Sequence, residues 1–335
     1  TDLKTEADAL QLDILSHRIA GDGDVTLQMA PEPHGLDLKF VFADLEVIHA
    51  GDDRAMLTGS DLQLGVGGDG YVLPGREEMD RDRTISLDVG GLAVPDLSLL
   101  QRYLPEKWPM RLHGGSGESR LSALLTPGSL KIDLNVTSDE ADMAIENYRF
   151  DTNLDAAIRL DNPSIMSSNT EVSGSYIRLS DAHLRKDGQR SPKAWDASLV
   201  IDKGFFSLLS DDNRQSGDDV LDLFEVLGRS EASQLLGDST GSFEFDADVS
   251  SLAWIGVLFK QEHQTTIAGQ GTVGGTMELE AGMPAPGTDI RVESQELALN
   301  FLDYRSQGDG EVRLQVSEGG DNPDWNIRVD LEQAD

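Results

Sequence analysis

Short segments in which apolar and polar residues alternate recur along the whole chain. In the segment GLDLKFVF at 35–42, one face carries Leu36, Leu38, Phe40 and Phe42, and the charged Asp37 and Lys39 fall on the other. The alternation returns in later segments, with the apolar members Leu130, Ile132, Leu134 and Val136; Phe243 and Phe245; Ile290 and Val292; Val312, Leu314 and Val316; and Ile327, Val329 and Leu331. Side chains of a β-strand point alternately to its two faces, so the pattern predicts antiparallel strands with one buried face. The continuous apolar strands of a parallel α/β sheet are missing.

Helical patterns are few and short. A short helix is predicted after Pro95, over 96–103, and a second over 218–227, where Gly228 provides a stop. A further turn at 235–236 and a helix over 250–259 complete the set. We expect these helices to cap a sheet, so the predicted fold is mostly β with a few short capping helices.

The chain also contains an internal repeat, visible as four landmarks in the same order. These landmarks are Asp96 and Asp248, Gly115-x-Gly117 and Gly269-x-Gly271, Pro127-Gly128 and Pro286-Gly287, and Tyr148-Arg149 and Tyr304-Arg305. Each unit is expected to be a capping helix followed by a β-meander, in which Gly-x-Gly bends a strand and Pro-Gly marks a tight turn. A weaker third copy would start at Gly21. Stacked units predict an elongated, twisted antiparallel sheet, half-open as a groove.

The repeat divides the chain into four expected segments. Residues 1–95 form an N-terminal β segment with the degenerate copy, and 96–170 form the first repeat. Residues 171–240 are a connecting β segment with a helical cap, and 241–335 form the second repeat.

Composition excludes several classes of function. The chain has 61 Asp and Glu against 27 Lys and Arg, a net charge of −34, which would repel nucleic acid and an anionic membrane surface. It has no cysteine, hence no disulfide, thiolate metal site or cysteine nucleophile. The longest apolar run, Leu252 to Phe259, is far shorter than the roughly 20 residues that span a bilayer. Because the sequence starts at Thr1 without a leader, we expect a processed or trimmed piece.

Motifs for catalysis or cofactor binding are missing as well. There is no phosphate-binding loop, zinc-binding HExxH helix, complete EF-hand or nucleophile elbow, and the six histidines are scattered singly. The acidic loop at 211–219 offers oxygen ligands for calcium, but its spacing favours a solvated turn. We therefore predict a non-enzymatic protein with no cofactor, no catalytic residue and no metal site.

Two segments, from Leu99 to Gly117 and from Gly269 to Val316, resemble the AsmA-like superfamily of Gram-negative envelope proteins. The shared elements are helix, Leu-Pro and Gly-Gly-x-Gly in the first, and Gly-x-Gly, Pro-Gly and Tyr-Arg separated by strands in the second. The resemblance implies a half-open β-sheet with a hydrophobic groove, held in the periplasm by an N-terminal inner-membrane helix outside this chain. It also implies a role in phospholipid transport and outer-membrane assembly, with lipid and other envelope proteins as partners.

A lipid groove needs a continuous apolar strip, which alternating strands supply on one face. The candidate lining residues are Leu130, Ile132, Leu134, Phe243, Phe245, Ile290, Val292, Leu297, Leu299 and Phe301. The same residues would also fill a closed core, as in a structural or adhesive β-rich domain of a salt-adapted surface protein. A glycoside hydrolase that uses paired carboxylates is a third alternative, disfavoured by an aromatic content of 6%.

Overall fold

The structure, a computed structural model, describes most of the chain. The described residues are 2–14, 16–31, 34–69, 83–104, 110–126, 128–145, 148–162, 170–186, 189–190, 194–207, 240–250, 266–280, 283–301, 304–319 and 323–332. They form 19 β-strands and one 3-10 helix, η1 (Leu97–Tyr103). The strands are β1 (Asp2–Ile14), β2 (His17–Pro31), β3 (His34–His49), β4 (Leu57–Asp69), β5 (Arg83–Val94), β6 (Met110–Gly114), β7 (Gly117–Thr126), β8 (Ser129–Ile145), β9 (Tyr148–Asn162), β10 (Thr170–Glu171), β11 (Tyr176–Lys186), β12 (Gln189–Arg190), β13 (Trp195–Ser207), β14 (Thr240–Val249), β15 (Thr266–Glu280), β16 (Met283–Pro284), β17 (Asp289–Phe301), β18 (Tyr304–Ser317) and β19 (Asp324–Glu332).

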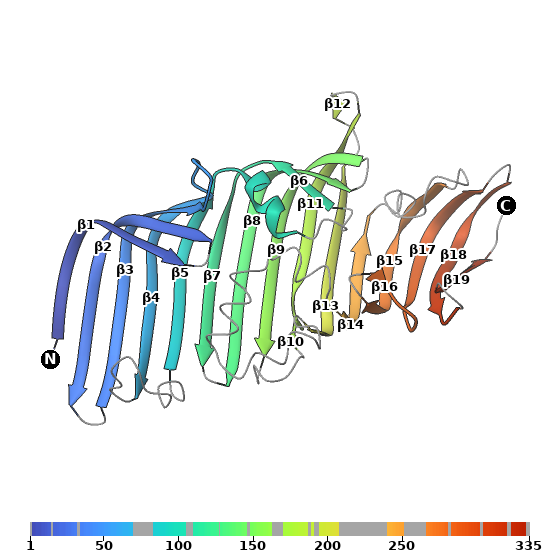
Figure 1. Cartoon of the computed structure of the whole chain (residues 1–335). Coiled ribbons are helices and arrows are strands. Elements are labelled where there is room, and N and C mark those ends of the chain that lie inside the picture. The colour runs from blue at the N-terminus through green and yellow to red at the C-terminus, as the bar shows by residue number, and fades with distance from the viewer. Residues whose placement is uncertain are drawn as a thin grey trace.

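All the described strands belong to one sheet, and every pairing in it is antiparallel (Figure 1). Four of the strands, β6, β10, β12 and β16, are short. The other fifteen pair in the order β1–β2–β3–β4–β5–β7–β8–β9–β11–β13–β14–β15–β17–β18–β19. Neighbouring strands lie about 4.8 Å apart, so the sheet is about 67 Å long. The predicted fold class, an elongated antiparallel meander, is confirmed.

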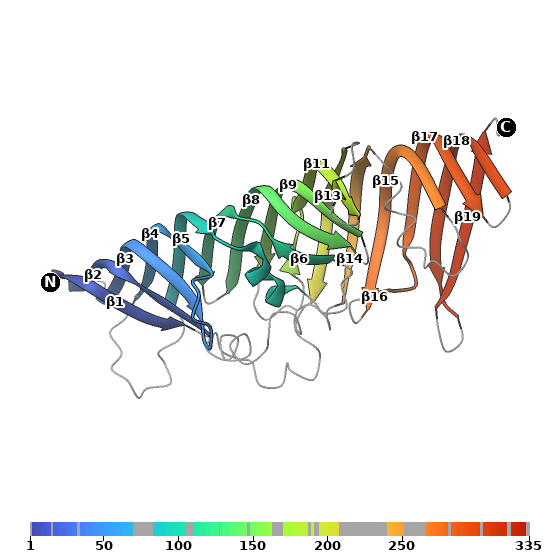
Figure 2. The ribbon, with the colours of Figure 1, turned by 90° about the horizontal axis from the view of Figure 1, so that it is seen from above.

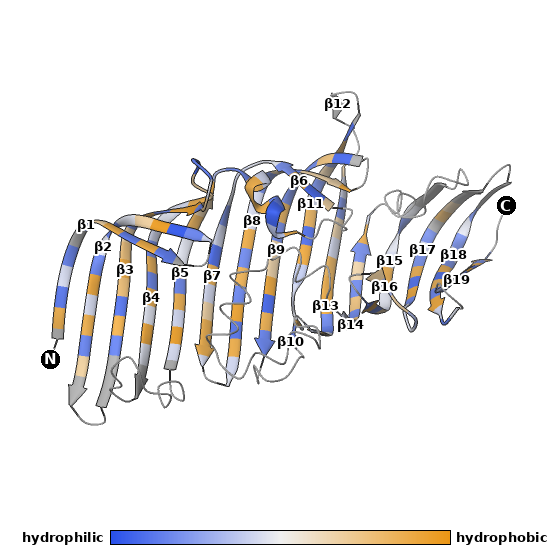
Figure 3. Ribbon diagram, in the orientation of Figure 1, coloured by the Kyte–Doolittle hydropathy of each residue, from blue (hydrophilic) through white to orange (hydrophobic). Residues whose placement is uncertain are grey.

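The two faces of the sheet differ in polarity, and alternating bands of hydropathy run along the strands (Figure 3). In β8, Leu130, Ile132 and Leu134 take one face, while Lys131 on the opposite face forms an ion pair of 2.8 Å with Asp161 of β9. The face that carries Leu130, Ile132 and Leu134 is called the apolar face below, and the other the polar face.

Bulges interrupt the ladders, and strands bend there (Figure 2). The pairing shifts between Ala7 and Leu10, Asp22 and Gly23, Val89 and Leu92, Ser138 and Ala141, Ser180 and His183, and Ser294 and Leu297. Apolar side chains on both sides of the bend pack into one cluster, as Phe42 and Leu62 do with Leu45 and Leu92. The sheet is therefore creased, with its apolar face on the inside of the bend.

In the first repeat, two glycines and a buried serine hold neighbouring strands together at this crease, and we call this set of contacts a lock. Gly115 has a φ of +97°, in the left-handed region that favours glycine. The buried hydroxyl of Ser138 donates a 2.6 Å hydrogen bond to the carbonyl of Ser116. A Cβ added to Gly117 would lie 2.4 Å from the carbonyl oxygen of Thr137. Close approach of β7 to β8 thus requires glycine at 117.

The second repeat forms the same lock in β15 and β17. Gly269 has a φ of +132°, and the buried Ser294 donates a 2.8 Å hydrogen bond to the carbonyl of Gln270. A Cβ at Gly271 would lie 2.0 Å from the carbonyl oxygen of Glu293. The Gly-x-Gly landmarks of the repeat are therefore structurally equivalent.

The Pro-Gly landmarks are not equivalent. Thr126 and Ser129 close the hairpin between β7 and β8 through a 2.8 Å contact between their hydroxyls. Gly287 instead lies between β16 and β17, where the amide of Thr288 donates to the carbonyl of Ala285 over 3.1 Å. The two glycines of the Pro-Gly landmarks therefore occupy different positions: Gly128 lies in the hairpin between β7 and β8, whereas Gly287 lies between β16 and β17.

The helix predicted over 96–103 is present, as the 3-10 helix η1. Asp96 caps its first turn, because the carboxylate accepts a 3.0 Å hydrogen bond from the amide of Ser98. The helices predicted over 218–227, 235–236 and 250–259 lie outside the described residues, apart from Ser250.

Candidate functional site

One row of directly opposed residues crosses the apolar face from β3 to β19. We call it the spine row, and its members are Leu45, Gly59, Leu92, Ser119, Val136, Ala156, Ile177, Leu199, Ala247, Val273, Val292, Val312 and Val329. No member is charged. At about 4.8 Å per strand, the row is about 58 Å long.

Three further rows lie beside the spine row on β3, β4, β5, β7, β8 and β9. They are Phe42, Leu62, Val89, Leu121, Leu134 and Ile158; Phe40, Leu64, Leu87, Ala123, Ile132 and Leu160; and Leu38, Val66, Ile85, Leu125, Leu130 and Asn162. Along the first of them the cover decreases: Phe42 is fully buried, Leu134 is half-buried, and Ile158 is 46% exposed. Along this row the apolar face is therefore closed at β3 and open at β9.

Helix η1 supplies much of the cover near β3. Leu99, Leu100 and Tyr103 pack against the cluster that contains Phe42 and Leu62. Leu97 is fully buried in a second cluster with residues of β8, β9, β11 and β13.

The sequence candidates on β8 lie together. Each of the three rows beside the spine row contains one of these candidates: Leu134 in the first, Ile132 in the second and Leu130 in the third. All three side chains are half-buried. Their partners on β9 are Asn162, Leu160 and Ile158. Three strands, β9, β11 and β13, separate this group from the candidates on β14 and β17.

The C-terminal candidates form a second group on the same face. Val292 belongs to the spine row, while Phe245 and Ile290 face each other across Gly275 of β15. Phe243 is half-buried, and Leu297 is fully buried in the cluster around Val292. The side chains of Leu299 and Phe301 lie outside those that the structure describes. Leu297 therefore has a core environment, whereas Phe243 and Ile290 are partly accessible.

Sequence reasoning missed the densest part of the apolar face, on β4 and β5. Leu62, Leu64, Leu87 and Val89 all belong to the largest buried cluster or pack against it. Their alternation in LQLGVG and ISLDVG is the signal that identifies them.

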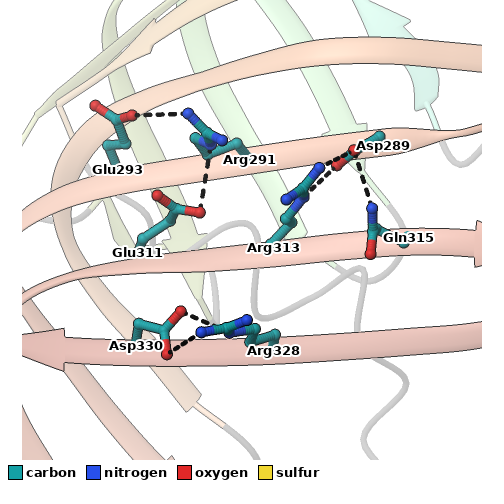
Figure 4. Close-up of polar contacts among 8 residues, drawn as sticks. All are labelled: Asp289, Arg291, Glu293, Glu311, Arg313, Gln315, Arg328 and Asp330. Carbon is teal, nitrogen blue, oxygen red and sulfur yellow. Dashed lines mark hydrogen bonds and ion pairs between the residues drawn. The ribbon is translucent and has the colours of Figure 1, made fainter.

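The polar face of β17–β19 carries a cross-strand network of charges (Figure 4). Arg291, Arg313 and Arg328 are directly opposed across the three strands. Each is neutralised by acids in adjacent rows. Arg291 lies 3.3 Å from Glu311 and 3.7 Å from Glu293, and Arg328 lies 2.8 Å from Asp330.

Arg313 and Asp289 form the tightest pair in this network. Nε of Arg313 donates a 2.8 Å bond to Asp289, Nη2 donates a second bond, and Gln315 donates a third at 3.0 Å. Hydrogen bonds from Arg313 lower the pKa of the Asp289 carboxyl below its ordinary value. This part of the polar face is nearly balanced in charge, with three arginines against four carboxylates.

The polar face of β13 and β14 lacks that balance. Asp246 lies near Asp202, Glu244 and Asp248, and desolvation followed by contact with Asp202 raises the pKa of the Asp246 carboxyl. Lys203 makes a 3.4 Å ion pair with Glu244. The acid excess therefore lies on the polar face of these strands, opposite Phe245 and Ala247.

Metal-binding and membrane-spanning features were sought in the part of the chain that the structure describes. No group of three or more His, Asp or Glu side chains there could hold a metal ion. No helix in those ranges is long and apolar enough to cross a membrane.

No family model, no curated protein and no solved structure matches this chain.

Proposed function

We propose that this protein binds the acyl chains of lipids along the spine row, as a non-enzymatic domain. The observation that carries the proposal is the continuity of that row: thirteen neighbouring strands contribute no charged side chain to it. An acyl chain gains about 0.8 kcal/mol for each methylene group removed from water, so a dozen methylenes contribute roughly 10 kcal/mol before ordering costs.

The accessible part of the row lies between the cover of η1 and Val273 of β15, where the row is buried again. Ile177, Leu199 and Ala247 are half-buried, and the neighbouring Ile158 is 46% exposed. An acyl chain laid on these residues would lie across β9, β11, β13 and β14. The acidic polar face behind them keeps the sheet soluble and limits adhesion between copies.

The cellular setting that we propose is the periplasm, with an inner-membrane tether outside this chain. There the domain would conduct phospholipid toward the outer membrane together with other envelope proteins. The support is the resemblance of Leu99–Gly117 and Gly269–Val316 to AsmA-like proteins, together with the elongated creased sheet.

Photo-crosslinking from two adjacent positions tests lipid binding. Ile158 is 46% exposed on the apolar face, and the side chain of Arg159 is 53% exposed on the polar face. A photoreactive residue at 158 should yield lipid adducts, by mass spectrometry, in protein expressed in a Gram-negative envelope. The same residue at 159 should yield none. Equal labelling at both positions, or none at either, would contradict the proposal.

The second candidate is a structural or adhesive domain of a salt-adapted surface protein with a closed core. Full burial of Phe42 and Leu297 and the unbalanced acids around Asp246 favour it. It predicts a large drop in melting temperature on chelation or desalting and no bound lipid. Acyl-chain binding with a melting temperature insensitive to chelation excludes it.

A further inference from the structure

Helix η1 lies within the crease, at the boundary between the closed and open parts of the apolar face. It follows β5 and precedes β6, and Figure 2 shows it beside the inner face of the bent strands. Leu97, at its start, is 1% exposed in the cluster of β8 and β9, whereas Leu99 and Leu100 contact the cluster of β3–β5. An acyl chain that followed the spine row from β9 toward β3 would meet this helix.

The start of η1 is firmly fixed. The amide of Leu97 donates to the carbonyl of Gly115 over 2.8 Å, and the Asp96 carboxylate caps the helix and binds Arg54 at 2.7 Å. Ser98 and Arg54 hold the pKa of the Asp96 carboxyl below its ordinary value. This end stays attached at any pH above that pKa.

The C-terminal end of η1 is held by a different set of groups. Oη of Tyr103 lies 2.5 Å from Nε2 of His17 and donates to Sδ of Met56 over 3.3 Å. The rings of His17 and Tyr103 stack, and the ring of His49, directly opposite His17 in the β2–β3 pair, lies 5.3 Å away.

Two further contacts complete this attachment. Arg102 forms a 2.6 Å ion pair with Asp52, and the side chain of Gln101 accepts a 2.7 Å hydrogen bond from the amide of Leu112.

We propose that the C-terminal end of η1 is an acid-sensitive gate on the apolar face, closed by Tyr103 on neutral His17 and opened when His17 is protonated. The idea that the gate controls access of lipid rests on the proposed lipid function. The closed position of η1 does not depend on that function, because it is defined by the contacts of Tyr103, Arg102 and Gln101.

The charges around His17 favour opening in acid. Protonated His17 would face the positive charge of Arg102 on η1, beside the ring of His49 on β3. The acidic side chain among these groups is Asp52, and it already forms an ion pair with Arg102. On the β1 side, Asp13 pairs with Arg18 at 3.2 Å. Like charges in a partly desolvated cluster repel, so the closed state loses stability.

Burial, with His49 and Arg102 adding to it, lowers the pKa of His17 below 6.5. A histidine whose pKa is lowered in the closed state takes up its proton more readily once released. The closed state is therefore fully stable above pH 6.5 and loses stability as the pH falls below that value.

A spin label on η1 tests the gate independently of any lipid. Because the chain has no cysteine, Leu104→Cys provides a single labelling site just beyond Tyr103. The label should be immobile at pH 7.5 and gain a mobile component as the pH falls below 6.5, in protein whose circular dichroism is unchanged. In the double variant His17→Gln and His49→Gln, the mobility of the label should be the same at pH 5 as at pH 7.5, because glutamine does not take up a proton in this range. His183→Gln, a histidine on β11 that contacts Asp181, is the matched control and should behave as the parent protein.

Binding of a fluorescent fatty acid to the same samples separates the two proposals. We expect tighter binding at pH 5 than at pH 7.5 in the parent protein, and no such difference in the double variant. A label that stays immobile at pH 5, or is mobilised equally in the double variant, overturns the gate. A label that becomes mobile without fatty-acid binding at any pH overturns the lipid function and leaves the movement of η1 standing.

Discussion

The strands from β2 to β8 and the strands from β9 to β19 share one apolar face but bury it to different depths. Beneath η1, Phe42, Leu62 and Leu92 are at most 3% exposed. Beyond it, Ile177 and Leu199 of the same face are half-buried, Val273, Val292 and Val312 are buried again at no more than 8% exposed, and Val329 at the far end is 42% exposed. Alternation alone thus makes a face apolar, and packing beneath η1 or within the crease decides which part of that face is core and which is surface.

Two leucine truncations should sharpen this comparison most. Leu62→Ala removes a buried side chain beneath η1 and should cost about 3 kcal/mol of unfolding free energy. Leu199→Ala, on the half-buried part of the spine row, should cost about 1 kcal/mol. Urea unfolding monitored by circular dichroism measures both. Equal losses would show that the face beyond η1 is as closed as the face beneath it.

Glycine substitutions test whether the crease has the same construction in both regions. Gly117→Ala and Gly271→Ala place a Cβ 2.4 and 2.0 Å from a carbonyl of the next strand, so each should cost about 1–3 kcal/mol. Gly128→Ala, which meets no atom within 4 Å, is the control and should be nearly neutral. If only one of the two crease variants melts early, the two locks are not equivalent.

Removal of the buried hydroxyls should have a smaller effect. Ser138→Ala and Ser294→Ala each remove a buried hydroxyl together with the hydrogen bond that it donates to a backbone carbonyl, at a cost of about 1–2 kcal/mol. Thermal melts of the two variants should shift by similar amounts. The control is Ser122→Ala on the polar face, where no loss is expected.

Two carboxylates on the polar face should give the smallest effects, with opposite signs. The pKa of Asp289 is lowered, so its stabilising contribution is present at neutral pH and disappears as the pH falls through 3.8 and below. The pKa of Asp246 is raised, so its ionisation destabilises the fold at neutral pH and protonation relieves this as the pH falls. Asp289→Asn should slightly lower the melting temperature at pH 7, and Asp246→Asn should slightly raise it. Shifts of the same sign would contradict these assignments.

The alternation of apolar and polar residues predicted the fold class and the face on which each residue lies, as for Leu130, Ile132 and Leu134. The position of the crease was only partly predictable. Gly115 and Gly269 mark it in the two repeats. Asp61 and Asp181, with φ values of +60° and +53°, also adopt the left-handed region, but a non-glycine residue gives no sign of that conformation in the sequence.

The depth of burial was the least predictable feature. Val292 and Leu297 carry the same kind of side chain as Ile177 and Leu199. The first two are buried in a cluster, whereas Ile177 is half-buried and Leu199 is half-buried at the margin of that cluster. Cover depends on contacts between elements distant in sequence, such as Tyr103 of η1 with His17 of β2. Local alternation contains no information on those contacts.

Native mass spectrometry of the protein purified from a Gram-negative envelope tests the central claim, that the apolar face from β9 to β14 is open to lipid acyl chains. We predict, beside the mass of the chain, adducts with the masses of phospholipids, lost when Leu199 and Ile177 are both replaced by Asp. A chain that carries no lipid, in protein that is fully folded, would contradict the claim.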